Sequence, residues 1–309
     1  MDASLTKRPG SLWERVVETT ATALHSGALQ PVETRLETLD EVGIRFQVRV
    51  LTGGRHKIEA GRAQAAASTR QGRYVDPFQP WEPDLYVTDV SDTHVCLLNK
   101  YNVVDHHLLI VTRAFEHQMA PLTAGDFEAA WRCLAEFEGL VFYNAGRVAG
   151  ASQEHRHLQM VPLPLPDSGA GEGMPLERLI SHAATGNGGS ENRRLPFRHV
   201  IRAVQRQWLR DPIQGGRDTL SHYGEMLTRS GLQSGNEPGE ARLPPYNLLL
   251  TRKWIMFVPR SEAPAVETDV NALGFAGALL AGDETEFRAI RTSGPFAVLG
   301  RAGLPPTAR

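Results

Sequence analysis

The sequence predicts a mixed α/β (α+β) fold in which helices pack on a sheet of mainly antiparallel strands. The runs "HVCLLNKY" and "HHLLIVTR" are apolar, rich in branched residues and separated by the short "NVVD". They therefore predict two neighbouring strands that are joined tightly. "YNLLLTRKWIMFVPR" has the same character and predicts a hairpin that turns at residues 251–253. Between these blocks, "LTAGDFEAAWRCLAEFEG" places apolar residues at helical spacing.

Length and composition limit the class of protein. The chain has 309 residues, which suits one large domain or two fused domains. Hydrophobic residues make up 41% and charged residues 22%, so a sizeable buried core can form. The formal net charge is −2 and no long basic run occurs, so we expect no extensive binding to duplex nucleic acid. A small anionic ligand remains compatible, because local charge need not follow net charge.

The sequence shows no targeting or membrane-spanning segment. The first twenty residues lack the apolar region of a secretory signal. No stretch approaches the ~18 consecutive apolar residues of a membrane span. Cys96 and Cys133 form no CxxC pair and lie among apolar residues, so both are expected in the core. We therefore expect a cytoplasmic protein with no membrane contact.

The elements of the N-terminal part follow from local patterns. Residues 44–52 alternate apolar and polar side chains and predict a strand. Residues 53–73 are small and polar and predict a loop with some local helix, and residues 76–87 carry three prolines and predict an irregular segment. Residues 11–25 predict a helix. Its expected apolar face consists of Leu12, Val16, Val17 and Leu24.

The elements of the middle and C-terminal parts are read in the same way. In the helix of "LTAGDFEAAWRCLAEFEG", Thr123 is the expected N-cap, Phe127 and Trp131 face the core, and Gly139 is expected to end the helix. "LVFYNAG" and "EHRHLQMV" predict strands, and "DTLSHYGEMLTRSGL" predicts a helix. Residues 167–195 are rich in Gly, Ser, Asn and Glu and predict a flexible segment.

The stretch "SQEHRHLQMVPLPLP" carries the candidate chemistry. On a strand, alternate side chains share a face, so His155, His157 and Gln159 are expected on one face and Arg156 with its alternate neighbours on the other. The proline run cannot continue a ladder and ends the strand near residue 161. The preceding loop "GRVAGAS" is small and rich in glycine, so its backbone N–H groups can hold phosphate oxygens.

These residue types suit nucleophilic catalysis by histidine. A neutral imidazole offers one lone-pair nitrogen to phosphorus, while its other nitrogen donates its proton to an acceptor. A covalent histidine–nucleotide splits one difficult transfer into two easier steps. The same H-x-H pattern also occurs in metal sites and as surface decoration. The adjacent His106 and His107 face opposite ways on a strand and do not readily share one ion.

The motif resembles the ATP adenylyltransferases, or diadenosine tetraphosphate (Ap4A) phosphorylases, of the histidine-triad (HIT-like) superfamily. The resemblance extends over "LVFYNAGRVAGASQEHRHLQMVPLP" and over "LLNKYNVVDHHLLIVTRAFEHQMAPLTAGDF", where the superfamily pattern N-x-x-x-V-V-x-x-H-x-L is matched. "YNLLLTRKWIMFVPRS" resembles the family's C-terminal segment. The chain departs from the pattern at Asn102 and Asp105, where proline is common.

The resemblance implies roles for individual residues. His157 would attack the α-phosphate, and His155 and Gln159 would flank and orient it. The residues implied in substrate binding are Lys57, Asn99, Lys100, Asn144, Gly150, Ala151, Ser152, Gln153 and Lys253. No protein ligands for a metal are implied. A Mg²⁺ ion associated with the substrate is expected to neutralise the polyphosphate.

The resemblance also implies a domain organisation and a reaction. Residues 1–166 are expected to form the N-terminal Ap4A phosphorylase region, and 196–309 an ATP adenylyltransferase region packed with it as one catalytic unit. The expected partners are Ap4A, ATP, ADP and inorganic phosphate. Two alternatives remain at this point. One is another histidine-triad nucleotidyltransferase or a dinucleoside polyphosphate hydrolase, and the other is a non-catalytic nucleotide-binding sensor.

Overall fold

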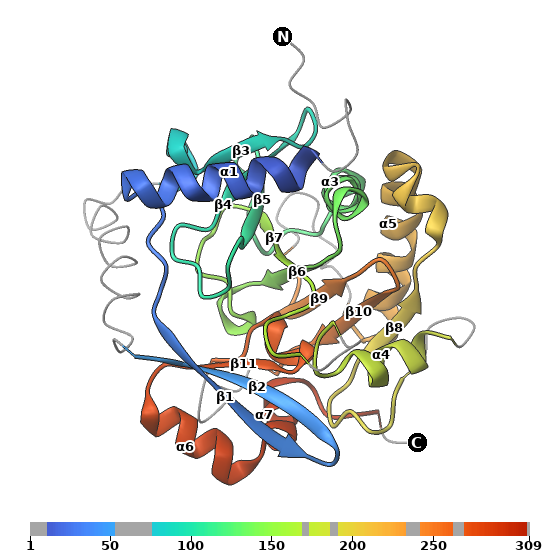
Figure 1. Ribbon diagram of the computed structural model, residues 1–309. Helices are drawn as coiled ribbons and strands as arrows, with labels where there is room; N and C mark the ends of the chain where they lie inside the picture. The colour runs from blue at the N-terminus through green and yellow to red at the C-terminus, as the bar shows by residue number, and fades with distance from the viewer. Residues whose placement is uncertain are drawn as a thin grey trace.

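The structure is a computed structural model that describes residues 11–52, 76–168, 173–185, 191–232, 242–261 and 269–307. Its centre is an eight-stranded antiparallel sheet in the order β3-β4-β5-β7-β6-β9-β10-β8 (Figure 1). The strands are β3 (Tyr86–Asp89), β4 (His94–Leu98), β5 (Leu108–Thr112), β6 (Gly139–Ala145), β7 (His157–Pro162), β8 (Val200–Ala203), β9 (Tyr246–Leu250) and β10 (Trp254–Pro259). This architecture confirms the predicted fold class.

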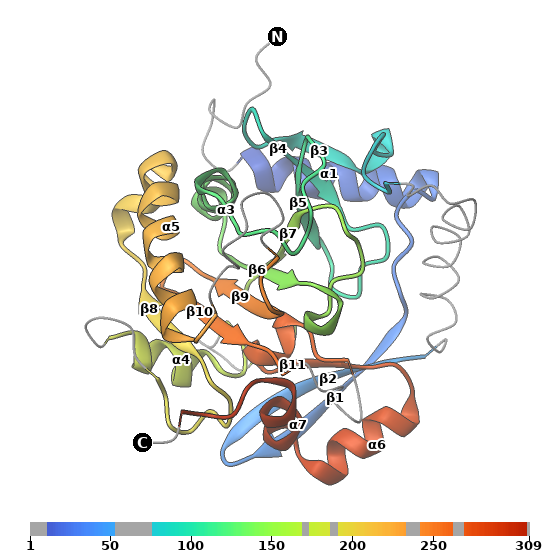
Figure 2. The ribbon, with the colours of Figure 1, turned by 180° about the vertical axis from the view of Figure 1, so that it is seen from behind.

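A second sheet has three strands in the order β1-β2-β11. Strand β1 (Thr34–Glu41) pairs antiparallel with β2 (Ile44–Leu51), and β11 (Ala278–Ala281) pairs parallel with β2. The sequence predicted β2 but not β1, because β1 is a half-exposed strand of largely polar residues without a clean alternation. Figures 1 and 2 show the small sheet below the main one, with α6 (Glu284–Ser293) and α7 (Pro295–Ala302) beside it.

Helices cover the face of the main sheet that points away from the small sheet. Helices α1 (Ser11–Ser26), α3 (Ala124–Glu136) and α5 (Pro212–Arg229) share one apolar cluster with the central strands. A second cluster lies between the other face of the main sheet and the small sheet, and α4 (Glu177–Ala184) takes part in it. These two clusters bury β6, β9 and β10 on both faces, whereas the second face of β4 and β5 packs in a third cluster with Phe78. Burial on both faces explains why the sequences of these strands are apolar.

Two helix predictions require a correction of detail. Helix α1 forms as predicted, but its buried face holds Leu12, Val16 and Ala23, whereas Val17 and Leu24 are exposed. The spacing explains the difference, because positions i, i+4 and i+11 of a helix fall on one side. Helix α3 has the predicted Thr123 cap, in a capping box, but it ends at Glu136. Gly139 is instead the first residue of β6.

Other predictions can be compared directly with the structure. The hairpin is confirmed as β9 and β10, and Phe127, Trp131, Cys96 and Cys133 are buried as expected. Residues 53–73, including Lys57, lie outside the described residues. The segment 167–195 contains α4, and its predicted flexibility stays a prediction. No described helix is both long and apolar enough to cross a membrane.

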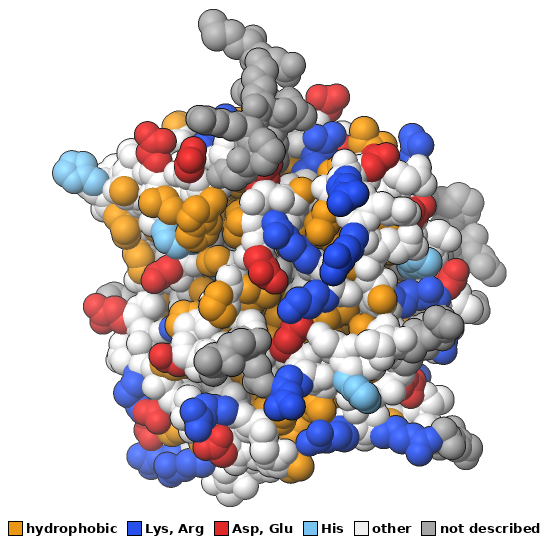
Figure 3. Space-filling model, turned by 45° about the vertical axis from the view of Figure 1, so that its right-hand side comes forward, with side chains coloured by type: hydrophobic (Ala, Val, Ile, Leu, Met, Phe, Trp, Pro, Cys, Tyr) orange, Lys and Arg blue, Asp and Glu red, His pale blue; other side chains and the backbone are white. Residues whose placement is uncertain are grey.

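Basic and acidic side chains lie close together on the face shown in Figure 3. Among the described residues, Arg132 pairs with Glu128 on α3, and Arg202 pairs with Glu225. Such ion pairs reduce any local excess of positive or negative charge, in keeping with the formal net charge of −2.

Candidate active site

The candidate site is centred on His157, the first residue of β7. Its ring is almost fully buried, and Nδ1 lies 2.8 Å from the backbone carbonyl oxygen of His155. A carbonyl oxygen only accepts, so Nδ1 donates and the lone pair is on Nε2. Burial lowers the pKa of His157 to about 4, although the bond to the carbonyl acts in the opposite direction. His157 is therefore neutral at physiological pH, and the Nε2 lone pair has the chemistry that a histidine nucleophile requires.

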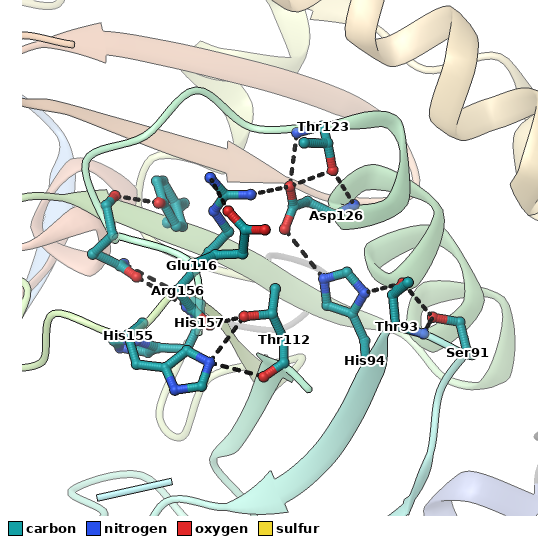
Figure 4. Close-up of polar contacts among 12 residues, drawn as sticks. Ser91, Thr93, His94, Thr112, Glu116, Thr123, Asp126, His155, Arg156 and His157 are labelled. Carbon is teal, nitrogen blue, oxygen red and sulfur yellow. Dashed lines mark hydrogen bonds and ion pairs between the residues drawn. The ribbon is translucent and has the colours of Figure 1, made fainter. Parts of the chain in front are cut away.

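The His155 side chain makes contacts within the protein at both ring nitrogens, and Figure 4 shows those with Thr112. Nδ1 lies 2.7 Å from a carboxylate oxygen of Asp76. Nε2 lies 2.9 Å from the Thr112 hydroxyl and 2.8 Å from the Thr112 carbonyl oxygen. The ring is fully buried and packs against Phe78 and Phe115. His155 therefore lies beside His157, but its ring nitrogens are already engaged by protein groups.

Gln159 lies two residues further along β7, on the same face as His157. Its partner in register on β5 is Leu109, and His107 precedes that strand. His107 Nδ1 accepts from the Asn99 side-chain amide at 3.1 Å, while its buried Nε2 has no hydrogen-bond partner among the described residues. Burial lowers the pKa of His107 to about 4, with the neighbouring Gln159 opposing the shift. Gln159, His107 and Asn99 thus form a row of polar side chains that begins beside His157.

The predicted phosphate loop follows β6 and contains a short 3-10 helix, Arg147–Ala149. Gly146 and Gly150 have φ of 87° and 97°, which only glycine adopts readily. A Cβ on Gly150 would lie 2.6 Å from Cβ of Asn271, so space also requires glycine there. Ala151 and Gln153 are half-buried and Ser152 is exposed, which leaves the end of the loop open to solvent.

Buried amides hold this loop against the sheet. The Asn144 side-chain oxygen accepts from Asn247 at 2.8 Å and from the backbone N–H of Ala272 at 3.0 Å. The Asn247 amide also donates to the carbonyl oxygen of Ala149 at 2.9 Å. The Asn144 oxygen is thus engaged in fixing the loop, whereas the resemblance implied only a pocket-lining role.

Gln118 joins the ends of β6 and β7 next to the site. Its side-chain oxygen accepts from the His157 N–H at 2.9 Å, and its amide donates to the carbonyl oxygens of Asn144 and His157. Gln118 is 2% exposed, so these bonds satisfy a buried amide. Neither periodicity nor residue spacing indicated a role for Gln118, because its contacts depend on tertiary structure.

A buried charge network lies behind the histidines (Figure 4). Arg156 points to the opposite face of β7 and its guanidinium lies 3.2 Å from the Asp126 carboxylate. His94 Nε2 lies 3.1 Å from the other Asp126 oxygen. Burial alone would raise the pKa of Asp126, but the bond from His94 and the charge of Arg156 hold that pKa below its ordinary value. The network anchors the residue between the two histidines to the start of α3.

The structure does not bring every predicted residue to His157. Lys253 follows β9, whose register places Leu250 opposite Val141, whereas His157 lies at the other end of β6. The Lys253 side chain is 61% exposed and lies 3.5 Å from Glu177. The sheet register thus places Lys253 away from His157, and the contact with the polyphosphate that the resemblance implied stays a prediction.

Lys100 is also engaged elsewhere. Its ammonium group pairs with Glu82 and lies 6.0 Å from the ring centroid of Tyr101. The adjacent histidines separate, although both precede β5 and neither lies on a strand as predicted. His107 is buried, whereas half-buried His106 contacts Thr20 and the ring of Trp13 on α1. Within the described residues, no group of three His, Cys, Asp or Glu side chains is arranged to hold a metal ion.

Known proteins resemble this chain over most of its length. The Ap4A phosphorylase N-terminal domain matches residues 2–182, and the ATP adenylyltransferase C-terminal domain matches residues 193–305. Diadenosine 5',5'''-P1,P4-tetraphosphate phosphorylase 2 of Saccharomyces cerevisiae is 29% identical over 279 residues, which cover 75% of this chain and 77% of that protein.

Two solved structures share the fold. Yeast Ap4A phosphorylase Apa2 in complex with Ap4A has a TM-score of 0.73 at 22% identity, covering 96% of this chain and 98% of that chain. The same yeast protein in complex with AMP has a TM-score of 0.72 at 24% identity, covering 96% and 97%.

Proposed function

Because the chain belongs to the Ap4A phosphorylase family, we propose that this nucleotidyltransferase cleaves diadenosine tetraphosphate with inorganic phosphate to give ATP and ADP. The reverse reaction joins ADP and ATP and releases phosphate. The names of the yeast relative and of the complexes with Ap4A and AMP support this substrate class. The geometry of His157 supports the route by which the reaction proceeds.

In the first step, His157 Nε2 attacks the α-phosphorus and ATP leaves with the electron pair of the broken P–O bond. The product is AMP bound to His157 through a P–N bond. In the second step, a phosphate oxygen attacks the same phosphorus, the P–N bond breaks, and ADP is released. Two in-line displacements give overall retention of configuration at phosphorus.

The observation that carries this mechanism is the 2.8 Å bond between His157 Nδ1 and the His155 carbonyl oxygen. It fixes one tautomer and directs the lone pair of the other nitrogen towards the substrate side. The glycine loop after β6 would place backbone N–H groups near the phosphoryl oxygens, and Gln159 would donate to them without adding charge. Both groups would stabilise the negative charge that develops on the oxygens bound to phosphorus.

We further propose that Mg²⁺ enters with the polyphosphate. The described residues offer no three-residue cluster for the ion, so the substrate oxygens would supply most of its ligands. Its chemistry would be to neutralise the charge of the leaving ATP.

A phosphate-dependence test checks the proposal. The protein is incubated with Ap4A and Mg²⁺, with and without inorganic phosphate, and products are separated by chromatography. We expect ATP and ADP only when phosphate is present, and no turnover by His157→Ala. His25→Ala, which alters an exposed histidine at the end of α1, is the matched control and should react like the wild type.

The other outcomes identify the alternatives. ATP and AMP formed without phosphate would make the protein a hydrolase. Turnover of a nucleotide sugar in place of Ap4A would indicate a different transferase. Tight nucleotide binding without turnover would indicate a sensor and refute the proposed reaction.

A further inference from the structure

Asp76 contacts the motif from a segment that the sequence analysis treated only as irregular. One oxygen of its carboxylate lies 2.7 Å from His155 Nδ1, and the other accepts from the backbone N–H of Phe78 at 2.9 Å. The His155 side chain is fully buried and that of Asp76 is 13% exposed. The carboxylate is therefore directed into the protein by two hydrogen bonds.

The same segment also reaches the nucleophile. The Phe78 ring centroid lies 5.3 Å from that of His157 and 5.6 Å from that of His155. Asp76 thus fixes both the His155 ring and, through the Phe78 backbone, an aromatic ring that limits movement of His157.

The position of His155 matters because its backbone carbonyl orients His157. That carbonyl accepts from His157 Nδ1 at 2.8 Å. The His155 ring is held between Asp76 on one side and Thr112 on the other, so neither ring nitrogen is free to contact a phosphate. The histidine-triad resemblance assigns the His155 side chain to the phosphate, whereas these bonds assign it to the support of His157.

We propose that Asp76 is a positioning residue for adenylyl transfer: its carboxylate holds His155, and the His155 carbonyl thereby holds His157 in the attacking orientation. This inference rests on the proposed function, because His157 must be the nucleophile. It predicts that loss of the carboxylate slows transfer of AMP to His157 while leaving nucleotide binding nearly intact, since both carboxylate oxygens of Asp76 bond to protein groups.

The first experiment compares Asp76→Asn with the wild type in single turnover. Asparagine has the same shape and retains an oxygen for the Phe78 N–H, so the fold should persist, which urea unfolding checks. We expect the rate of AMP transfer from Ap4A to His157 to fall about 100-fold, the loss typical of a small misplacement of a reacting group. The dissociation constant for AMP should change less than about threefold. The control Asp84→Asn removes an exposed carboxylate nearby and should behave like the wild type.

Chemical rescue separates positioning from general structural support. Asp76→Ala removes a group the size of formate, so added formate should restore part of the transfer rate, whereas chloride at equal ionic strength should not. A wild-type transfer rate in Asp76→Asn, or a loss that follows only weaker AMP binding, would overturn the inference.

A second readout does not depend on turnover. Nitrogen-15 NMR of the nucleotide-free protein reports which ring nitrogen of His157 carries the proton. The wild type should show the Nδ1–H tautomer alone, and Asp76→Asn should show a mixture. A single Nδ1–H tautomer that is unchanged in Asp76→Asn would overturn the positioning role, whether or not the proposed reaction occurs. A wild-type protein that forms no AMP adduct would separately refute the proposed reaction.

Discussion

Removal of the Asp126 charge should destabilise the protein far more than removal of a surface charge on the same helix. Asp126 is fully buried and is shared by Arg156 and His94. Asp126→Asn removes the buried counter-charge of Arg156 and leaves only the half-exposed Glu116 carboxylate at 3.8 Å. Breaking a buried pair costs about 3–5 kcal/mol of unfolding free energy. The Arg156 side chain is 3% exposed, so water cannot replace the lost partner.

Two matched variants divide this loss into its parts. Asp126 also completes the capping box of α3 with Thr123. Thr123→Ala removes the cap but keeps the charge, and should cost about 0.5–2 kcal/mol. Glu128→Gln breaks a half-exposed pair with Arg132 one turn away and should cost about 0.3–0.5 kcal/mol.

The assay is urea unfolding at pH 7 with linear extrapolation. The folded state lowers the pKa of Asp126, so this group adds stability above its unfolded pKa of about 3.9, and the contribution is lost as pH falls through the folded pKa. The gap between wild type and Asp126→Asn should therefore narrow below about pH 4. If Asp126→Asn lowers the unfolding free energy by less than about 1 kcal/mol at pH 7, or by no more than Glu128→Gln does, the stabilising role of the buried charge network is refuted.

Three further predictions concern the site. Because burial lowers the pKa of His157 to about 4, kcat/KM should stay level from pH 7 to pH 5 and fall only as His157 protonates near pH 4, whereas a fall centred near pH 6.5 would contradict the assignment. Gly150→Ala should weaken AMP binding measured by calorimetry at least about tenfold, because φ is 97° and the new Cβ meets Asn271. Lys253→Ala should change kcat/KM for Ap4A less than about threefold, since the Lys253 side chain lies beside Glu177 and away from His157 in the sheet register. A larger loss would support the polyphosphate contact that the resemblance implies.

Local patterns predicted the elements that local physics determines. The N-cap at Thr123 and the hairpin of β9 and β10 depend on neighbouring residues, and both formed as predicted. The pairing of β6 with β9 joins segments about a hundred residues apart in the chain, and no periodicity reports such a pairing. The half-exposed β1 was missed because its partners, rather than its composition, make it a strand.

The site was predicted unevenly for the same reason. Alternation along one strand located His157 and Gln159, because those residues depend on the period of β7 alone. Asp76, Gln118 and Asp126 support the motif from other elements, and single carboxylates or amides in a sequence carry no sign of their partners.

The His155 side chain shows that a sequence motif does not determine the direction in which a side chain points. Its position beside His157 follows from spacing, but the direction of its ring follows from Asp76 and Thr112. A motif identifies the residue type that a reaction requires. The surrounding contacts determine whether that side chain faces the substrate or the protein interior.

The most direct test of the account is to locate AMP on the enzyme. The protein is mixed with Ap4A and Mg²⁺ without phosphate, quenched under alkaline denaturing conditions that preserve a P–N bond, digested and mapped by mass spectrometry. The account predicts AMP on His157 and on no other residue, and loss of the adduct with formation of ADP when phosphate is added before the quench. AMP on His155, or turnover of Ap4A with no adduct on His157, would contradict it.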